Sequence, residues 1–192
     1  MNTQVNTTNE GAAQGLEAER ASLGAQLAGK YMTFKLADEA YGLEIRKVLE
    51  IIGLMDITRV PRAEDFIRGV INLRGRVIPV VDLRLKFGMA ACEATDQTVI
   101  IVVQYTCHGQ QMTMGILVDQ VLEVLPIEAN QIEPPPTFGT TAISTDFILG
   151  VGKADKRVIF LVDIGKVLNA KENDALATAA SSASKEVEAS SP

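Results

Sequence analysis

The chain has 192 residues, a net charge of −6, a pI near 4.9 and a hydrophobic fraction of 47%, which fit one soluble domain of ordinary size or two small lobes that share a core. An acidic chain does not supply the positive field that neutralises phosphates, so nucleic acid is excluded as a main partner, as is electrostatic binding to a membrane. No apolar run approaches the roughly 20 residues that span a bilayer. Residues 1–29 also lack the basic and apolar regions of a secretory signal. We therefore predict a cytoplasmic protein with no direct membrane insertion.

The two ends of the chain differ from its middle in composition. Residues 1–29 are rich in Ala, Gln, Gly and Glu, and we predict a flexible N-terminal arm with some helical tendency over residues 16–27. Residues 171–192 consist mostly of Ala, Ser and Glu. Such a segment buries too little apolar surface to offset the entropy of ordering, so we predict a disordered tail. The folded body is therefore expected over residues 30–170.

The body consists of short apolar runs that Gly, Asp, Pro and Thr interrupt. The chain has no Trp and only 5% aromatic residues, so Val, Ile and Leu must build the core. β-Branched side chains pack well on a pleated surface, and many short strands with regular turns favour a barrel or a sandwich. Short helices are expected over residues 61–68 and 163–170. The expected strands cover residues 30–36, 41–45, 50–54, 77–81, 99–104, 112–118, 121–125 and 158–162.

An internal repeat organises these strands. The string DFIRGV recurs as DFILGV, and the same offset aligns RVIPVVDL with RVIFLVDI. A second block matches at an offset shorter by eight residues, which fits a longer, Pro-rich connection in the second copy. Because both blocks occur in the same order, we expect two similar β lobes packed face to face. The matched segments are 65–70 with 146–151, 76–83 with 157–164, and 42–51 with 115–124.

The sequence offers little for catalysis. His108 is the only histidine and follows Cys107 in an expected hairpin turn, where neighbouring side chains point to opposite faces. One His with Cys92 and Cys107 does not match zinc spacing, and no Gly-rich phosphate loop is present. We predict no catalytic residue, no metal site and no cofactor. A small β-barrel hydrolase that uses His108 and Cys107 remains an alternative.

Four charged residues stand out from the apolar pattern. Asp82 and Asp163 end equivalent strands, and we expect each to cap the helical turn that follows rather than to form a catalytic pair. Arg74 projects from a predicted tight turn, either as an interface anchor or as a solvated hairpin residue. Glu50 lies among aliphatic residues and either faces water or needs a partner, for which Arg74 is the candidate.

Several strings in this pattern resemble the CheW family: YGLEI with VLEI, FIRGVINLRG, IPVVDLR with a following Phe, and then GILVD and LVDI. The resemblance covers about residues 30–170. It implies a mainly all-β fold of two SH3-like five-stranded β-barrel lobes, intertwined on a shared core, with short helical segments. It also implies a non-catalytic adaptor between the cytoplasmic tips of methyl-accepting chemoreceptors and the regulatory domain of the histidine kinase CheA, at receptor arrays on the inner face of the membrane.

The resemblance assigns two sets of binding residues. The receptor-binding positions in this chain are Val48, Glu50, Ile51, Arg74 and Gly75. The kinase-binding positions are Leu54, Asp56, Thr58, Arg59 and Val60.

Three related architectures are alternatives to a free-standing chemotaxis adaptor. An adaptor of another chemosensory array, such as one for pilus-based motility, would use the same fold. A fragment of CheA would be expected to bring phosphotransfer or ATP-binding segments, and a CheV protein would add a receiver domain. The sequence contains none of these segments, so we expect a free-standing adaptor. We also expect this adaptor to be a monomer by itself.

Overall fold

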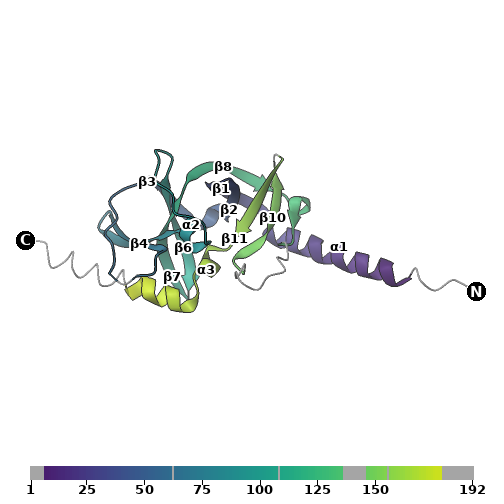
Figure 1. The fold of residues 1–192 in the computed structure, drawn as a ribbon. Coiled ribbons are helices and arrows are strands. Elements are labelled where there is room, and N and C mark those ends of the chain that lie inside the picture. Colours follow the sequence, from purple (N-terminus) through teal and green to yellow (C-terminus); the bar gives the residue numbers. More distant parts are fainter. Residues whose placement is uncertain (1–6, 62, 108, 136–145, 155, 179–192) are drawn as a thin grey trace, which may run out of the picture.

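The computed structural model describes residues 7–61, 63–107, 109–135, 146–154 and 156–178. Two curled β-sheets dominate it, and we call the part built on each sheet lobe A and lobe B (Figure 1). Lobe A contains β1 (Gly29–Leu36), β2 (Glu39–Glu44), β8 (Gln120–Ile127), β9 (Ile132–Glu133), β10 (Ile148–Ala154) and β11 (Arg157–Val162). Lobe B contains β3 (Val48–Gly53), β4 (Ile67–Leu73), β5 (Arg76–Asp82), β6 (Val99–Cys107) and β7 (Gln110–Val118). The predicted mainly all-β, two-lobed fold class is confirmed.

The helical segments are short except for the first. They are α1 (Thr7–Leu27), η1 (Ile45–Lys47), α2 (Leu83–Lys86), η2 (Ala129–Gln131), α3 (Ile164–Val167) and a C-terminal helix over residues 170–178. In the described part of the chain, no helix has the length and apolarity to cross a membrane. The expected helix over residues 61–68 is wrong, because Ile67 and Arg68 already belong to β4, where Ile67 is buried in the core.

The two sequence repeats exchange strands rather than forming one lobe each. The strand order is β8-β1-β2-β11-β10-β9 in lobe A and β3-β6-β7-β5-β4 in lobe B. Lobe A therefore takes the β1–β2 hairpin from the first repeat, and lobe B takes the β6–β7 hairpin from the second. A parallel pair joins the repeats in each sheet: β2 with β11, and β5 with β7. Neither sheet can be completed by one repeat alone.

The strand sequences explain this placement. Central β6 is apolar almost throughout, with Val99 followed by four buried residues, because both of its faces are covered. Edge strand β3 instead alternates half-buried and exposed residues. Three apolar cores result, one between the lobes and one inside each lobe. The core between the lobes includes Phe34, Leu43, Val81, Ile101, Ile116 and Val162.

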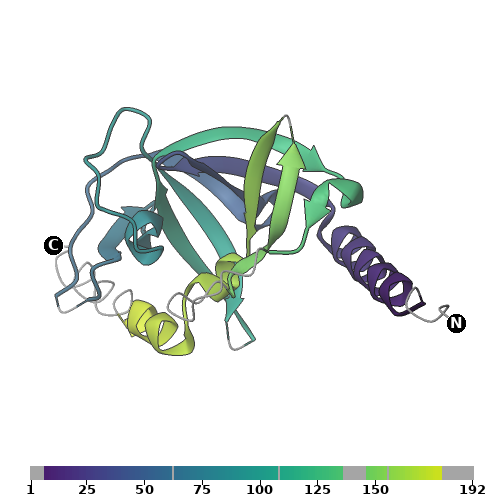
Figure 2. The ribbon, with the colours of Figure 1, turned by 45° about the vertical axis from the view of Figure 1, so that its right-hand side comes forward.

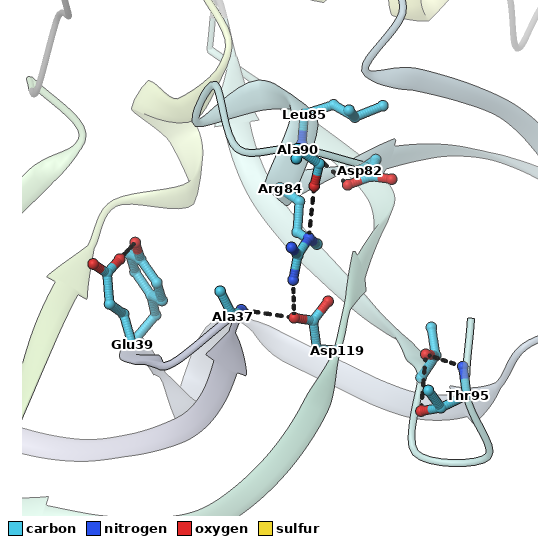
Figure 3. Close-up of polar contacts among 10 residues, drawn as sticks. Ala37, Glu39, Asp82, Arg84, Leu85, Ala90, Thr95 and Asp119 are labelled. Atoms are coloured by element: carbon cyan, nitrogen blue, oxygen red, sulfur yellow. Dashed lines mark hydrogen bonds and ion pairs between the residues drawn. The ribbon is translucent and has the colours of Figure 1, made fainter. Parts of the chain in front are cut away.

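Ion pairs fix the two points where the chain crosses between lobes. At the first crossing, in η1, Lys47 Nζ lies 2.9 Å from Asp163 Oδ1. At the second, between β7 and β8, the Arg84 guanidinium pairs with Asp119 (Figure 3). Asp119 Oδ2 also accepts the Ala37 N–H at 2.7 Å from the β1–β2 turn. Each crossing is thus tied to a segment that follows the last long strand of one repeat.

The predicted roles of Asp82 and Asp163 are confirmed. Asp82 Oδ1 accepts the Leu85 N–H at 3.2 Å at the start of α2 (Figure 3). Asp163 Oδ1 accepts the Gly165 N–H at 3.1 Å at the start of α3. Both carboxylates therefore cap the turn after equivalent strands.

The predicted disorder of residues 171–192 is wrong for residues 171–178, which form most of the C-terminal helix against lobe B (Figure 2). Leu176 is 0% exposed within the core between the lobes. Buried Asn173 accepts a hydrogen bond of 2.8 Å from the Tyr105 hydroxyl, whose pKa burial raises to about 12. Composition does not reveal these tertiary contacts. Residues 179–192 lie outside the described residues.

The N-terminal segment is more helical than its composition predicts. Helix α1 begins at Thr7, nine residues before the expected helical tendency at residue 16, and it ends at Leu27. Its C-terminal end packs against η2 and β9 of lobe A. Residues 1–6 lie outside the described residues.

We expect Leu176→Ala to lower the free energy of unfolding by about 2–4 kcal/mol, because it leaves a cavity in the core between the lobes. Urea unfolding followed by circular dichroism measures this loss. The exposed Lys171→Ala variant of the same helix is the control and should change stability by less than about 0.5 kcal/mol. Equal stabilities of the two variants would show that this helix does not pack as described.

We expect Asp119→Ala to destabilise the protein by about 1–3 kcal/mol, because the Arg84 side chain, only 16% exposed, loses its charged partner. The Ala37 N–H loses its acceptor in the same variant. Thermal unfolding of this variant is compared with that of Asp38→Ala, which removes an exposed carboxylate from the neighbouring turn. A similarly small effect of both changes would contradict the role of Asp119 at the crossing.

Candidate functional site

An exposed apolar strip follows the outer strand of lobe B. Leu49 is 50% exposed and Ile51 43%, and the strip continues through Leu54 and Met55 just after β3. Large apolar side chains gathered on one surface of a soluble protein mark a site of interaction. Ile51 and Leu54 were predicted from the sequence as binding residues, whereas Leu49 and Met55 were not. Only the position of β3 at the edge of the sheet distinguishes them from core residues.

The predicted partnership of Glu50 and Arg74 is confirmed. Arg74 Nη2 lies 2.8 Å from Glu50 Oε2, and Arg74 Nη1 lies 3.3 Å from Glu50 Oε1, so the guanidinium binds both carboxylate oxygens. Glu50 comes from β3 and Arg74 from the β4–β5 hairpin, which lie at opposite edges of the sheet. The ion pair therefore bridges the open side of the curled sheet.

A strained turn presents Arg74. The β4–β5 hairpin has the two-residue turn Arg74–Gly75, with φ of 53° at Arg74 and 82° at Gly75. Both values lie in the left-handed region, which Gly adopts readily and Arg does not. Asn72 Oδ1 accepts the Gly75 N–H at 2.9 Å and stabilises this turn. The geometry fixes Arg74 at the tip of the hairpin, where its side chain reaches Glu50 across the curled sheet.

The Glu50–Arg74 pair contributes little to stability. The Arg74 side chain is 77% exposed and that of Glu50 27%, and such exposed pairs contribute about 0.2–1 kcal/mol. An exposed guanidinium with a stacking face and five donors is nevertheless well suited to bind a partner. We conclude that the pair orients Arg74 rather than holding the lobe together.

The predicted receptor-binding residues lie on β3 and on the β4–β5 hairpin of lobe B, with Glu50 and Ile51 on opposite faces of β3. Val48 is half-buried beside Ile45 and packs on the core between the lobes. From there β3 continues through Glu50 and Ile51, and the Glu50–Arg74 pair links this strand to the hairpin of Arg74 and Gly75. The predicted residues therefore extend from the seam between the lobes onto lobe B.

The predicted kinase-binding residues continue from the same strand. Residues 54–60 leave β3 and cross to β4, where Thr58 exchanges two backbone hydrogen bonds with Val70, at 2.9 and 2.8 Å. Leu54, Asp56, Thr58 and Arg59 are exposed and Val60 is half-buried. This segment adds to the outer edge of lobe B. Arg59 lines a hollow of about 470 Å³ there, together with Ile57, Asp65, Ile67 and Arg68.

A second hollow has a different chemical character. It measures about 530 Å³ and lies at the seam, where η1, α3 and the ends of β6 and β7 meet. Arg46, Lys47 and Lys166 line it, with Asp163 as the carboxylate among its lining residues. Glu44 and Asp163 pair with two of these cations, at Arg46 and Lys47. This hollow is basic and polar, unlike the apolar strip of lobe B.

Of the residues considered for catalysis or metal binding, the structure describes the two cysteines but not the histidine. Cys92 is exposed and Cys107 is half-buried, and both are free thiols. His108, on which the hydrolase alternative depends, lies outside the described residues. Among the residues that the structure does describe, no group of three His, Cys, Asp or Glu side chains could hold a metal ion.

Comparison with known proteins agrees with the two-lobed geometry. Residues 30–172 match the CheW-like domain family. The chemotaxis protein CheW of Klebsiella aerogenes is 39% identical over 158 residues, which cover 82% of this chain and 92% of that protein. The protein FrzA of Myxococcus xanthus is 29% identical over 150 residues, covering 77% of this chain and 90% of FrzA.

A solved structure is similar in fold as well as in sequence. The scaffolding protein TtCheW from Thermoanaerobacter tengcongensis superimposes with a TM-score of 0.66 at 38% identity, over 76% of this chain and 96% of that chain. The family match spans both lobes and excludes the whole of α1. The chain therefore belongs to the CheW family of chemotaxis coupling proteins.

Proposed function

We propose that this adaptor couples the cytoplasmic tips of chemoreceptors to the regulatory domain of the kinase CheA, with lobe B carrying both contacts. The observation that supports this most strongly is the exposed apolar strip of Leu49, Ile51, Leu54 and Met55, on the same lobe as an Arg74 that Glu50 orients. Membership of the CheW family supports the coupling role. No chemical step is part of the proposal.

The receptor contact uses a helix against an apolar strand surface. A helical receptor tip presents apolar side chains at intervals of three and four residues, which suit Leu49 and Ile51 on β3. Arg74 then forms charge-assisted hydrogen bonds with acidic or carbonyl groups of the receptor and fixes its register. Because Glu50 already orients the guanidinium, little side-chain entropy is lost on binding.

The kinase contact uses the adjoining edge of lobe B. Residues 54–60 expose both apolar and charged side chains beside the hollow at Arg59. The two contacts share β3 and its continuation, so binding of one partner changes the surroundings of the other by a short path. Signalling is then a coupling free energy between adjacent sites on a rigid connector.

The site of action follows from the partners. An adaptor that binds receptor tips is recruited from the cytoplasm to receptor arrays at the inner face of the membrane. The chain is also similar to FrzA of Myxococcus xanthus, a relative that is not named CheW. This similarity is consistent with a second candidate role in a related chemosensory array. The two roles differ in which receptors bind, and not in the surface of lobe B that is used.

A co-sedimentation experiment tests the proposal. Receptor signalling domains in membranes are mixed with CheA and with this protein, and kinase in the pellet is measured together with its autophosphorylation. We expect the wild type to bring down CheA and Arg74→Glu to lose most of this effect. Arg76→Glu, which places the same charge change in the same hairpin, is the control and should behave as the wild type.

The double variant Glu50→Arg, Arg74→Glu separates two roles of Arg74. It restores an ion pair within the lobe but presents the opposite charge to a partner. Coupling should therefore remain lost. Recovery of coupling would show that Arg74 acts only within lobe B, and absence of binding by the wild type would contradict the proposed function.

Arg74→Asn separates binding from stability. Asn tolerates the left-handed conformation better than Arg, which offsets the lost ion pair. We expect the free energy of unfolding to stay within about 0.5 kcal/mol of the wild type while receptor coupling falls. Calorimetry and co-sedimentation measure the two quantities, and a strongly destabilised variant would contradict the limited energetic role of the pair.

A further inference from the structure

The outer edges of the two lobes are equivalent in the repeat. In lobe B, Thr58 pairs with Val70, and in lobe A, Glu133 pairs with Val151. Val70 and Val151 occupy matching positions in DFIRGV and DFILGV. The preceding glycine is matched as well. A Cβ atom on Gly69 would lie 2.1 Å from the Thr58 carbonyl oxygen, and one on Gly150 would lie 2.9 Å from that of Glu133.

The two edges differ in what covers them. Residues 54–59 of lobe B are mostly exposed. In lobe A, α1 packs against η2 and β9, as seen at the end of the molecule opposite lobe B (Figures 1 and 2). One of two equivalent edges is therefore occupied by the chain itself.

The contact of α1 with lobe A is closely fitted. The helix backbone meets η2 at Gly24, where a Cβ atom would lie 2.2 Å from the Ala129 carbonyl oxygen. Leu27 packs on the core of lobe A, and its carbonyl oxygen accepts a 2.6 Å hydrogen bond from the Tyr31 hydroxyl. A side chain at position 24 would not fit, so this glycine permits the close approach.

An ion pair completes the contact. Arg20 pairs with Glu133 of β9, which also lies 2.9 Å from Lys153 of β10. The hydrogen bond from Lys153 and the nearby Arg20 hold the pKa of Glu133 below its usual value. Glu133 therefore stays ionised and ties the helix to the two outermost strands of the sheet.

The contacts described for α1 come from its C-terminal part, at Arg20, Gly24 and Leu27. Gly15 and residues 17–22 are exposed, and the helix projects away from lobe A (Figure 1). The family match begins at residue 30, so α1 lies outside the common domain. The strand pairing of both sheets does not include α1, so release of the helix would leave both sheets intact.

We propose that α1 is a cap on the edge of lobe A that prevents association with a second copy of this chain and leaves the equivalent edge of lobe B as the one open for binding. Release of α1 exposes the backbone groups of β9 and the apolar surface under Leu27. An exposed strand edge of this kind pairs with another chain. The open edge of lobe B in a second copy, with exposed Leu54 and Met55, offers such a partner. The inference rests on the proposed function only for the role of lobe B.

Two substitutions on the same helix test the cap. Gly24→Leu places a side chain against the Ala129 carbonyl group, whereas Gly15→Leu is the matched control because a Cβ atom at Gly15 meets no atom within 4 Å. Both changes favour the helix itself, since Leu has a higher helix propensity than Gly. Sedimentation velocity over a range of concentrations of the full chain measures association, and hydrogen exchange measures protection of η2 and β9.

We expect the wild type and Gly15→Leu to sediment as monomers. Gly24→Leu should show a sedimentation coefficient that rises with concentration and faster exchange in η2 and β9. A monomeric Gly24→Leu protein, or equal association of both variants, would overturn the proposal. Arg20→Glu, which opposes Glu133 without a steric change, should associate in the same direction.

This test needs neither receptor nor kinase. Loss of the proposed coupling function would appear as absent co-sedimentation of the wild type with its partners, while the association of Gly24→Leu would be unaffected. Failure of the cap would leave co-sedimentation intact and both glycine variants monomeric. The two results therefore distinguish the two proposals.

Discussion

The exchange of hairpins between the repeats is the constraint on which the structure depends. Lobe A is complete only when β2 pairs in parallel with β11, and lobe B only when β5 pairs with β7. These pairs join strands far apart in the sequence, so both lobes must form together, with a core shared between them. A connector built in this way does not separate into two independent halves. Its two lobes keep one relative orientation, which an adaptor needs if binding at one surface is to change binding at another.

The ion pairs at the two crossings reinforce this orientation with opposite polarity. In the first crossing the cation, Lys47, belongs to the crossing segment and Asp163 to the segment that follows β11. In the second the anion, Asp119, belongs to the crossing segment and Arg84 to the helix that follows β5. The two pairs lie at equivalent crossings but use residues that the repeat does not match, since Lys47 aligns with Gln120 and Asp163 with Asp82. Contacts at equivalent places in the two lobes therefore differ in chemistry. The outer edges of the lobes differ as well, because α1 covers the edge of lobe A and not that of lobe B.

Local patterns predicted much of the fold and part of the site. Apolar alternation predicted the strands, and the repeat predicted the caps at Asp82 and Asp163. The Glu50–Arg74 pair was predicted because a carboxylate among aliphatic residues needs a partner. The exchange of hairpins could not be predicted, because repeats describe similar segments and not which of them pair. Leu176 was assigned to a disordered tail since its burial depends on a surface formed by distant strands. The exposure of Leu49 was missed because only the order of strands makes β3 an edge.

The central claim is that the partners bind lobe B along β3 and its continuation. Hydrogen exchange of this protein, measured free, with receptor signalling domains and with the kinase regulatory domain, tests it most directly. The account predicts that the receptor slows exchange of amides in residues 48–53 and at Arg74, and that the kinase domain slows exchange in residues 54–60. Amides of β9 and β10 in lobe A should exchange at the same rate in all three samples. Protection confined to lobe A, with lobe B unchanged, would contradict the account.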